Sequence, residues 1–456
     1  MKHTTKRLTA IFLTLCMLLS VLPLGAFAAS EPDSYVFDIA EGTIQVLDGD
    51  TAGKIKVRYG DGLTTPDFDP SQVITVTGTF VATGTPGKSL KVETNLPVTV
   101  RIRDLTIDNT AADYYEAMAL FGNAANVTLI LEGTNYLSGG KECGGIDVNE
   151  GRTLTIRGGG ALTAKGMAGA GIGGHNLNGC GTVIIESGTI NAIGSMGAAG
   201  IGGGGKFGSY NPTGNGGSVT INGGTVTASS DGGAADIGGG SDTADTGTLT
   251  VDGDAWVTAA NIGGTKTLTA GVVNGTVYGD VTLTADRTID DLTIPAGTSL
   301  TVSEGKTLTV NGTVTNSGTL TVFDDSSLAG TGSLTGNGSF VMETPEITVA
   351  SDLVETGEVL DPAATLGGSG FSFGGKDFTS DATGWTGPVY DPAEVRDAGE
   401  YTVSFTKNGV TVSKTFTVDC ELDFAEGNMG TTVRVGYNTV YGEVPASDRE
   451  GYTFDG

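Results

Sequence analysis

The sequence predicts an all-β protein whose central part is a right-handed parallel β-helix, and three observations lead to this prediction. Glycine supplies 76 of the 456 residues and proline only 13, against a usual glycine share of roughly 7%. The glycines alternate with short runs of Thr, Val, Ile and Leu, as turns alternate with strands. Similar strand pieces return every 25 to 36 residues, and no long segment has helical periodicity. Repeats of this length indicate a stacked solenoid.

The first 28 residues are predicted to be a signal peptide. Lys2, Lys6 and Arg7 form a positive region before an apolar stretch from Leu8 to Leu24. The small residues of Ala26–Ala28 then provide a cleavage site. A membrane anchor is the alternative, but the apolar stretch is short for a bilayer span. We therefore expect a secreted protein of the bacterial cell surface, with no membrane span in the mature chain.

The strongly acidic composition limits the classes of partner. The chain has 24 basic and 52 acidic residues and a formal net charge of −28. Such a surface repels nucleic acid and anionic lipid, so neither is expected as a partner. Paired carboxylates at turns suggest Ca²⁺ as a possible cofactor, although Asp-Gly is also an ordinary turn dipeptide. The candidate metal ligands are Asp48, Asp50, Asp252 and Asp254.

Each repeat has three pieces in a fixed order. The first is an apolar strand, at Leu154–Ile156, Val183–Ile185, Val219–Ile221 and Leu249–Val251. The second is a strand, led by glycine in three of its four copies, at Gly160–Ala164, Gly188–Ala192, Gly224–Ala228 and Asp254–Ala259. The third is an Ala-x-Ile-Gly-Gly segment, at Ala170–Gly174, Ala199–Gly203, Ala235–Gly239 and Ala260–Gly264. Such short strands bury a core only by stacking coil on coil, which favours a β-helix over a propeller with its longer blades.

The predicted β-helix covers residues 29–344. It begins with a cap at about 31–80, continues with the Gly-Ile-Gly-Gly repeats at about 125–265, and ends with narrower coils at about 266–344. The narrower coils are inferred from closely spaced Leu-Thr-Val and Leu-Thr-Ile pieces.

The repeats differ in length at one corner, after the isoleucine of the third piece. Corners of one type line up along one face of a solenoid, and such a face is often the binding face. Sugar binding needs exposed rings with amides and carboxylates nearby. The candidates on this face are Phe207, Tyr210, Asn211, His175 and Asn176, and Tyr114 and Tyr115 form a second candidate at another corner. The alternative is that these rings pack against their own loops.

Cysteine and histidine are scarce after the leader. Cys143, Cys180 and Cys420 give an odd count without regular spacing, so no disulfide framework is expected. Cys143 and Cys180 fall at different corners and are predicted to be semi-buried free thiols. His175 is the single histidine, which excludes a site built from several histidines.

Composition changes near residue 345. Strands at intervals of about 8–12 residues predict a small β-sandwich over residues 345–419. Asp397–Tyr401 matches the Asp-x-Gly-x-Tyr corner, and the stretch resembles the immunoglobulin-like domains of bacterial surface proteins. Residues 420–456 resemble the Listeria–Bacteroides repeat of internalin type, through Tyr441–Pro445 and Arg449–Gly456. Because a tryptophan normally follows the last glycine of that repeat, the sequence is expected to end inside a partial repeat, with further surface domains beyond it.

The Gly-Ile-Gly-Gly columns resemble clostridial cell-surface β-helices of the carbohydrate-binding class. The resemblance implies a non-catalytic, adhesive surface protein that binds polysaccharide, such as a cell-wall or host glycan, and it implies calcium in some members. Two alternatives remain open. The chain could be a structural spacer that displays other domains, or a polysaccharide lyase or hydrolase. No convergent acid, base and cation stands out in the sequence, so no catalytic residue is assigned and catalysis is not expected.

Overall fold

The computed structural model describes residues 35–206, 213–242, 246–351, 353–356, 358–423 and 432–435. The chain divides into two compact units, Met1–Asn274 and Gly275–Gly456. The described residues are almost entirely strands and turns, with two short 3₁₀ segments, Ile39–Glu41 and Asp325–Ser327. The all-β prediction is confirmed.

The first unit opens with the predicted cap. Strand β1 (Tyr35–Asp38) pairs in parallel with β5 (Val73–Val81), so the first coil is already in place. Between them, β2 (Ile44–Asp48) pairs antiparallel with β3 (Ile55–Tyr59), which pairs with β4 (Leu63–Thr64). The hairpin covers the open edge of the first coil, an edge that would otherwise present unpaired backbone groups.

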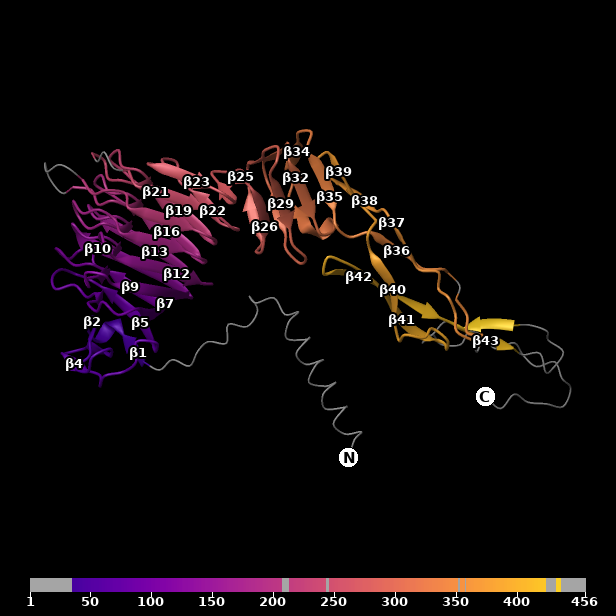
Figure 1. The fold of residues 1–456 in the computed structure, drawn as a ribbon, viewed down its shortest axis with the longest axis horizontal. Coiled ribbons are helices and arrows are strands. Elements are labelled where there is room, and N and C mark those ends of the chain that lie inside the picture. The colour runs from indigo at the N-terminus through magenta and orange to yellow at the C-terminus, as the bar shows by residue number, and fades with distance from the viewer. Residues whose placement is uncertain are drawn as a thin grey trace, which may run out of the picture. The chain divides into compact units, whose positions relative to one another are not determined.

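Two sides of the first unit are ladders of parallel strands that stack coil on coil (Figure 1). One side contains the first part of β7 (Val98–Asp108), whose last residues pair with β10 of the other side. It continues with β9 (Asn126–Glu132), β12 (Thr153–Gly158), β15 (Thr182–Ile185), β18 (Ser218–Ile221), β21 (Thr248–Val251) and β23 (Thr265–Leu268). The other contains β10 (Thr134–Lys141), β13 (Ala161–Met167), β16 (Thr189–Ile193), β19 (Thr225–Ser229), β22 (Trp256–Thr258) and β24 (Gly271–Val273).

The strand register places equivalent apolar residues above one another. Leu154 pairs with Val183, which pairs with Val219, and all three are buried. Each such side chain contributes roughly 1.5–3 kcal/mol by leaving water. The parallel, in-register stacking confirms the β-helix and excludes the propeller, which is an antiparallel architecture. The handedness of the coil stays a prediction.

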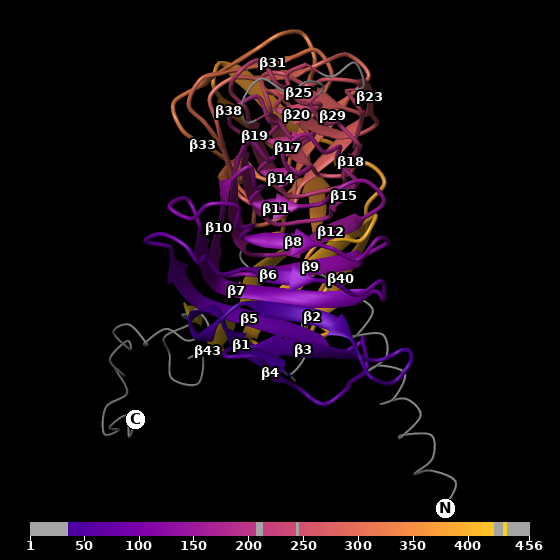
Figure 2. The ribbon, with the colours of Figure 1, turned by 90° about the vertical axis from the view of Figure 1, so that its left-hand side faces the viewer.

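The third side is made of very short strands. Figure 2 shows them one above another: β6 (Leu90–Val92), β8 (Met118–Leu120), β11 (Ile146–Asp147), β14 (Ile172–Gly173), β17 (Ile201–Gly202) and β20 (Ile237–Gly238). The isoleucines of β11, β14, β17 and β20 pair in register, and Ile237 also bridges to Ile262. The three-piece coil deduced from the repeats is therefore correct.

The second unit contains narrower three-sided coils, as expected. Residues stacked on one another are 17 to 22 positions apart, and 20 apart in the later coils, as in Leu300 with Leu320, and Leu308 with Leu328. The three sides are β26 (Asp280–Leu283), β29 (Ser299–Val302), β32 (Thr319–Val322) and β35 (Ser339–Met342); β27 (Arg287–Ile289), β30 (Leu308–Val310) and β33 (Leu328–Ala329); and β25 (Thr276–Tyr278), β28 (Leu292–Ile294), β31 (Thr313–Asn316) and β34 (Ser333–Thr335).

After the coils, two antiparallel sheets pack on a shared core. One is β36 (Glu346–Thr348) with β37 (Thr365–Gly367), and the other is β40 (Thr386–Asp391), β41 (Gly399–Lys407) and β42 (Val410–Val418). Ile347 of the first sheet contacts Val403 and Phe405 of the second. This arrangement agrees with the predicted sandwich.

The predicted corner fixes the start of β41. The Tyr401 hydroxyl accepts a hydrogen bond from the Arg396 amide at 3.3 Å and donates one to the Asp397 carbonyl at 3.0 Å. Such a tyrosine corner ties a strand back to the chain that precedes it.

Two further hairpins complete the described chain. Strands β38 (Gly370–Phe373) and β39 (Lys376–Ser380) form an antiparallel pair, and β39 pairs in parallel with β35 of the narrow coils. Strands β43 (Cys420–Asp423) and β44 (Thr432–Val435) also pair antiparallel. Most of the predicted partial repeat, including 437–456, lies outside the described residues, and the predicted domain boundaries stay predictions.

Candidate functional site

The Gly-Ile-Gly-Gly segments form closed turns on the third side of the first unit. In three successive coils, the amide of the alanine donates to the carbonyl of the last glycine: Ala170 to Gly174 at 2.9 Å, Ala199 to Gly203 at 3.0 Å, and Ala235 to Gly239 at 3.2 Å. Gly202 has φ of +138°, and a Cβ there would collide with the Gly238 carbonyl oxygen of the next coil. Glycine is therefore required for both the turn and the stacking.

The loops that follow these turns stack on one another. The Gly204 amide donates to the backbone carbonyl of Asn178 in the preceding coil at 3.0 Å, and the Gly240 amide donates to the Gly214 carbonyl at 3.0 Å. We call residues 174–180, 203–206, 213–216 and 239–242 the loop face. The prediction that the insertions collect along one face is confirmed.

The longest insertion leaves the loop face between Lys206 and Thr213. Its predicted sugar-binding residues, Phe207, Tyr210 and Asn211, lie outside the described residues. The loop is closed at its base by the Gly214 amide, which donates to Gly204 at 2.8 Å. Lys206 forms an ion pair with Asp242 of the next loop. The loop is thus fixed at its base within the loop face.

His175 and Asn176 lie where the first of these loops folds back onto the preceding coil. The His175 amide donates to Asn149 Oδ1 at 2.8 Å, and the Asn176 amide donates to the Glu142 carbonyl at 3.0 Å. The His175 ring is half-buried. The fold-back therefore brings this loop to the corner at 141–145.

The same corner contacts the second candidate. Lys141 forms an ion pair with Asp113 at 2.6 Å, and the Gly140 amide donates to the Tyr115 carbonyl at 2.9 Å. Tyr114 is 60% exposed and has a φ of +59°, whereas Tyr115 is half-buried against Gly87. The structure thus brings both predicted regions to one corner segment, and it leaves the ring of Tyr114 facing solvent.

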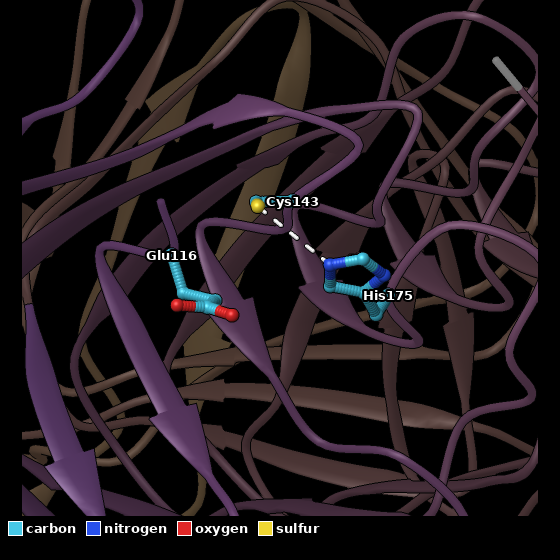
Figure 3. Close-up of side chains that lie close together, drawn as sticks. All are labelled: Glu116, Cys143 and His175. Carbon is cyan, nitrogen blue, oxygen red and sulfur yellow. Dashed lines mark hydrogen bonds between the residues drawn. The ribbon is translucent and has the colours of Figure 1, made fainter. Parts of the chain in front are cut away.

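Three side chains with metal-binding atoms converge beside this corner: Glu116, Cys143 and His175 (Figure 3). Cys143 Sγ lies 3.6 Å from His175 Nε2, and one potential ligand atom from each residue lies within 4.8 Å of the others. Cys143 is fully buried, while the other two are partly exposed. Within the described part of the chain, this is the only group of three or more such residues.

The cluster contains and adjoins several acidic groups, two of which, the Cys143 thiol and the Asp147 carboxyl, are buried. Burial raises the pKa of the Cys143 thiol, and the carboxylates of Asp147 and Glu116 raise it further. Burial also raises the pKa of Asp147 to about 7, and Glu116 adds to this effect while His175 opposes it. Lys91 Nζ lies 3.5 Å from the Glu116 carboxylate. Burial therefore disfavours the ionised forms of Cys143 and Asp147.

The predicted calcium ligands lie in the first unit, Asp48 at the end of β2 and the other three in the bends or turns between strands. Asp48 accepts a hydrogen bond from Thr94 Oγ1, and Asp50 forms an ion pair with Lys56. Asp252 accepts from the Gly253 amide at 2.9 Å. Asp254 is half-buried in the turn before β22. These contacts are typical of structural turns, and calcium binding stays a prediction.

Sequence reasoning did not assign Glu116 or Cys143 to a site. The sequence predicts Cys143 only as a semi-buried free thiol. Cys143 and Cys180 are free thiols, as predicted, but both are buried rather than semi-buried. The register offers a signal, because Glu116 and Cys143 lie two and three residues before the paired Met118 and Ile146. The fold-back of His175 has no counterpart in the repeat pattern.

No family model, no curated protein and no solved structure matches this chain. Among the described residues, no helix is long and apolar enough to cross a membrane.

Proposed function

We propose that the chain is a secreted, non-catalytic protein of a bacterial cell surface that binds polysaccharide along the loop face. The single observation that supports this most is the continuity of that face. Three successive loops are hydrogen-bonded to one another along the coil axis. A repeated, nearly linear surface matches a ligand that is itself a repeating chain.

The chemistry of the loops supports the same ligand class. Tyr114 presents an exposed ring beside the Asp113–Lys141 ion pair. Phe207, Tyr210 and Asn211 belong to the longest loop of the face. Rings that stack on pyranose faces, with charged and amide groups for the hydroxyls, form sugar sites. The positive φ of Tyr114 is the kind of strained backbone that is retained at ligand sites.

The test is a glycan array with the full chain, combined with an assay for newly released reducing ends. Binding without release supports the proposal. Release would identify a lyase or hydrolase instead, and neither binding nor release would favour a spacer.

Two variants then locate the site. Replacing Phe207 and Tyr210 together by Ala, or Tyr114 by Ala, is expected to weaken retention at least about tenfold, equivalent to about 1.4 kcal/mol. The matched control is Tyr136→Ala, which removes a half-buried ring from β10 on a flat side of the coil. Unchanged retention in both site variants would refute the proposed location.

A further inference from the structure

The Glu116, Cys143 and His175 cluster is built by three successive coils. Glu116 precedes β8, Cys143 precedes β11, and His175 follows β14. These three strands pair in register, Met118 with Ile146 and Ile146 with Ile172. The stacking of the coils therefore fixes the spacing of the three side chains along the axis. The site exists only when the coils are stacked.

Each of the three residues is held by hydrogen bonds of its own. The Glu116 carbonyl accepts from Ser89 Oγ at 2.6 Å and from Asn109 Nδ2 at 3.0 Å. The Cys143 amide donates to Gly140 at 3.2 Å, and the His175 amide donates to Asn149 Oδ1 at 2.8 Å. Backbones fixed in this way hold ligand atoms near one geometry, as a metal site requires.

The distance between sulfur and nitrogen matches a metal-bound pair. Zinc lies about 2.3 Å from a thiolate sulfur and about 2.0–2.1 Å from an imidazole nitrogen, with tetrahedral angles. Those lengths imply a sulfur–nitrogen separation of about 3.5–3.6 Å. Cys143 Sγ and His175 Nε2 are 3.6 Å apart. Only the Glu116 carboxylate needs to approach for all three to reach one ion.

We propose that Glu116, Cys143 and His175 bind one Zn²⁺ ion. A thiolate, an imidazole and a carboxylate are the donor set of a borderline-soft metal, whereas Ca²⁺ and Mg²⁺ take oxygen ligands. The site is therefore distinct from the calcium ligands expected at the aspartate turns. Three protein ligands leave a fourth position for water or an external ligand. The zinc site shares His175 with the loop face, but its test measures metal binding and needs no glycan.

The experiment uses the full chain, reduced and stripped of metal with a chelator. Titration with Zn²⁺ alone, followed by calorimetry, is expected to show one site per chain and a rise in Tm. Titration with Co²⁺ is expected to produce a thiolate-to-metal charge-transfer absorption, which reports sulfur ligation directly. Adding Ca²⁺ to the metal-loaded chain is expected to leave both the Tm of the Zn²⁺ form and the charge-transfer absorption of the Co²⁺ form unchanged.

Three single variants test the ligands: Glu116→Gln, Cys143→Ser and His175→Gln. Each is expected to weaken Zn²⁺ affinity by at least about 100-fold, since ligand loss exceeds the 10–100-fold cost of losing an outer-shell partner. Cys180→Ser is the matched control, because Cys180 is also a buried thiol and its burial raises its pKa to about 12. His175→Gln keeps the backbone contacts of its loop, so it remains informative if Cys143→Ser fails to fold.

Several outcomes would overturn the proposal. They are the absence of Zn²⁺ binding by the folded chain, a Co²⁺ spectrum without the thiolate band, and unchanged affinity in His175→Gln. Equal losses in Cys180→Ser and the cluster variants would also overturn it, because the effect would then follow from thiol loss or misfolding.

Discussion

The wide coils of the first unit and the narrow coils of the second are two versions of the same three-sided architecture. In the wide coils, equivalent isoleucines are 29 and 36 residues apart. In the narrow coils the stacked residues are 17 to 22 positions apart, and 20 apart in the later coils on every side. The difference lies largely on the third side, where the wide coils have Gly-Ile-Gly-Gly turns followed by loops.

In the wide coils, the strands that form the core and the loops that we propose to bind ligand are separate parts of each repeat. The glycine turns close on themselves, so the loop after each turn varies in length without shifting the strands. Those loops hold all of the predicted sugar-binding residues except Tyr114 and Tyr115. The narrow coils instead present short polar contacts between equivalent positions, such as Thr313 with Ser333 and Thr315 with Thr335, both at 3.3 Å. We therefore propose that ligand binding belongs to the wide coils and a structural role to the narrow ones.

The largest loss of stability is expected from adding a side chain to a glycine turn of the wide coils. Gly202→Ala would place a methyl group against the Gly238 backbone at a φ of +138°. We expect a loss of about 3 kcal/mol or more in unfolding free energy, since backbone cannot move aside without breaking the stack.

Urea unfolding measures this loss, and Gly159→Ala is the control. A Cβ at Gly159 meets no atom within 4 Å. That substitution is expected to be neutral or to stabilise by about 0.4–1 kcal/mol. Equal losses for the two substitutions would contradict the role assigned to the glycine turns.

A smaller loss of stability is expected from replacing a buried asparagine, and each type of coil offers one for comparison. Asn135 accepts from the Leu105 amide at 3.0 Å and donates to the Glu132 and Ala161 carbonyls, both at 3.0 Å. Asn316 donates to the Ser339 carbonyl at 2.8 Å, but its Oδ1 has no partner among the described residues.

Asn135→Ala is therefore expected to lower the free energy of unfolding by about 2–3 kcal/mol, because it leaves a buried amide and two carbonyls without hydrogen-bond partners. Asn316→Ala is expected to cost about 1 kcal/mol less, since one of its polar atoms is already unpaired. Urea unfolding of both variants checks the order, and a greater loss for Asn316→Ala would reverse the comparison.

The smallest effect is expected on the polar contacts of the narrow coils. Thr313→Val removes the contact with Ser333 at the surface and keeps the β-branched shape that suits a strand. We expect a change within about 0.5 kcal/mol, measured by thermal unfolding. A much larger loss would mean that these contacts hold the narrow coils together.

Much of the fold was predictable because the repeat is regular. The alternation of buried and exposed residues in Leu154–Ile156 and its copies fixes which side chains face inward. The narrow coils were predictable for the same reason, from Leu300–Val302 and Leu320–Val322. Short strands led by glycine have few other ways to bury their apolar side chains.

The site was less predictable, because it depends on where irregular loops fold. Cys143 and His175 are 32 residues apart, and only the return of the loop onto Glu142 brings them together. Likewise, the pairing of β39 with β35 depends on Phe378, which stacks on Phe371 and contacts Phe340 edge-on. Such contacts arise from tertiary packing and leave no periodic signal.

The most direct test of the account is hydrogen exchange of the full chain with and without a polysaccharide selected on the array. If the wide coils bind the polysaccharide and the narrow coils have a structural role, the added protection from hydrogen exchange will be confined to residues 174–180, 203–216, 239–247 and the corner at 109–117. Protection concentrated on residues 276–342, or a bound polysaccharide that protects none of the loop face, would contradict it.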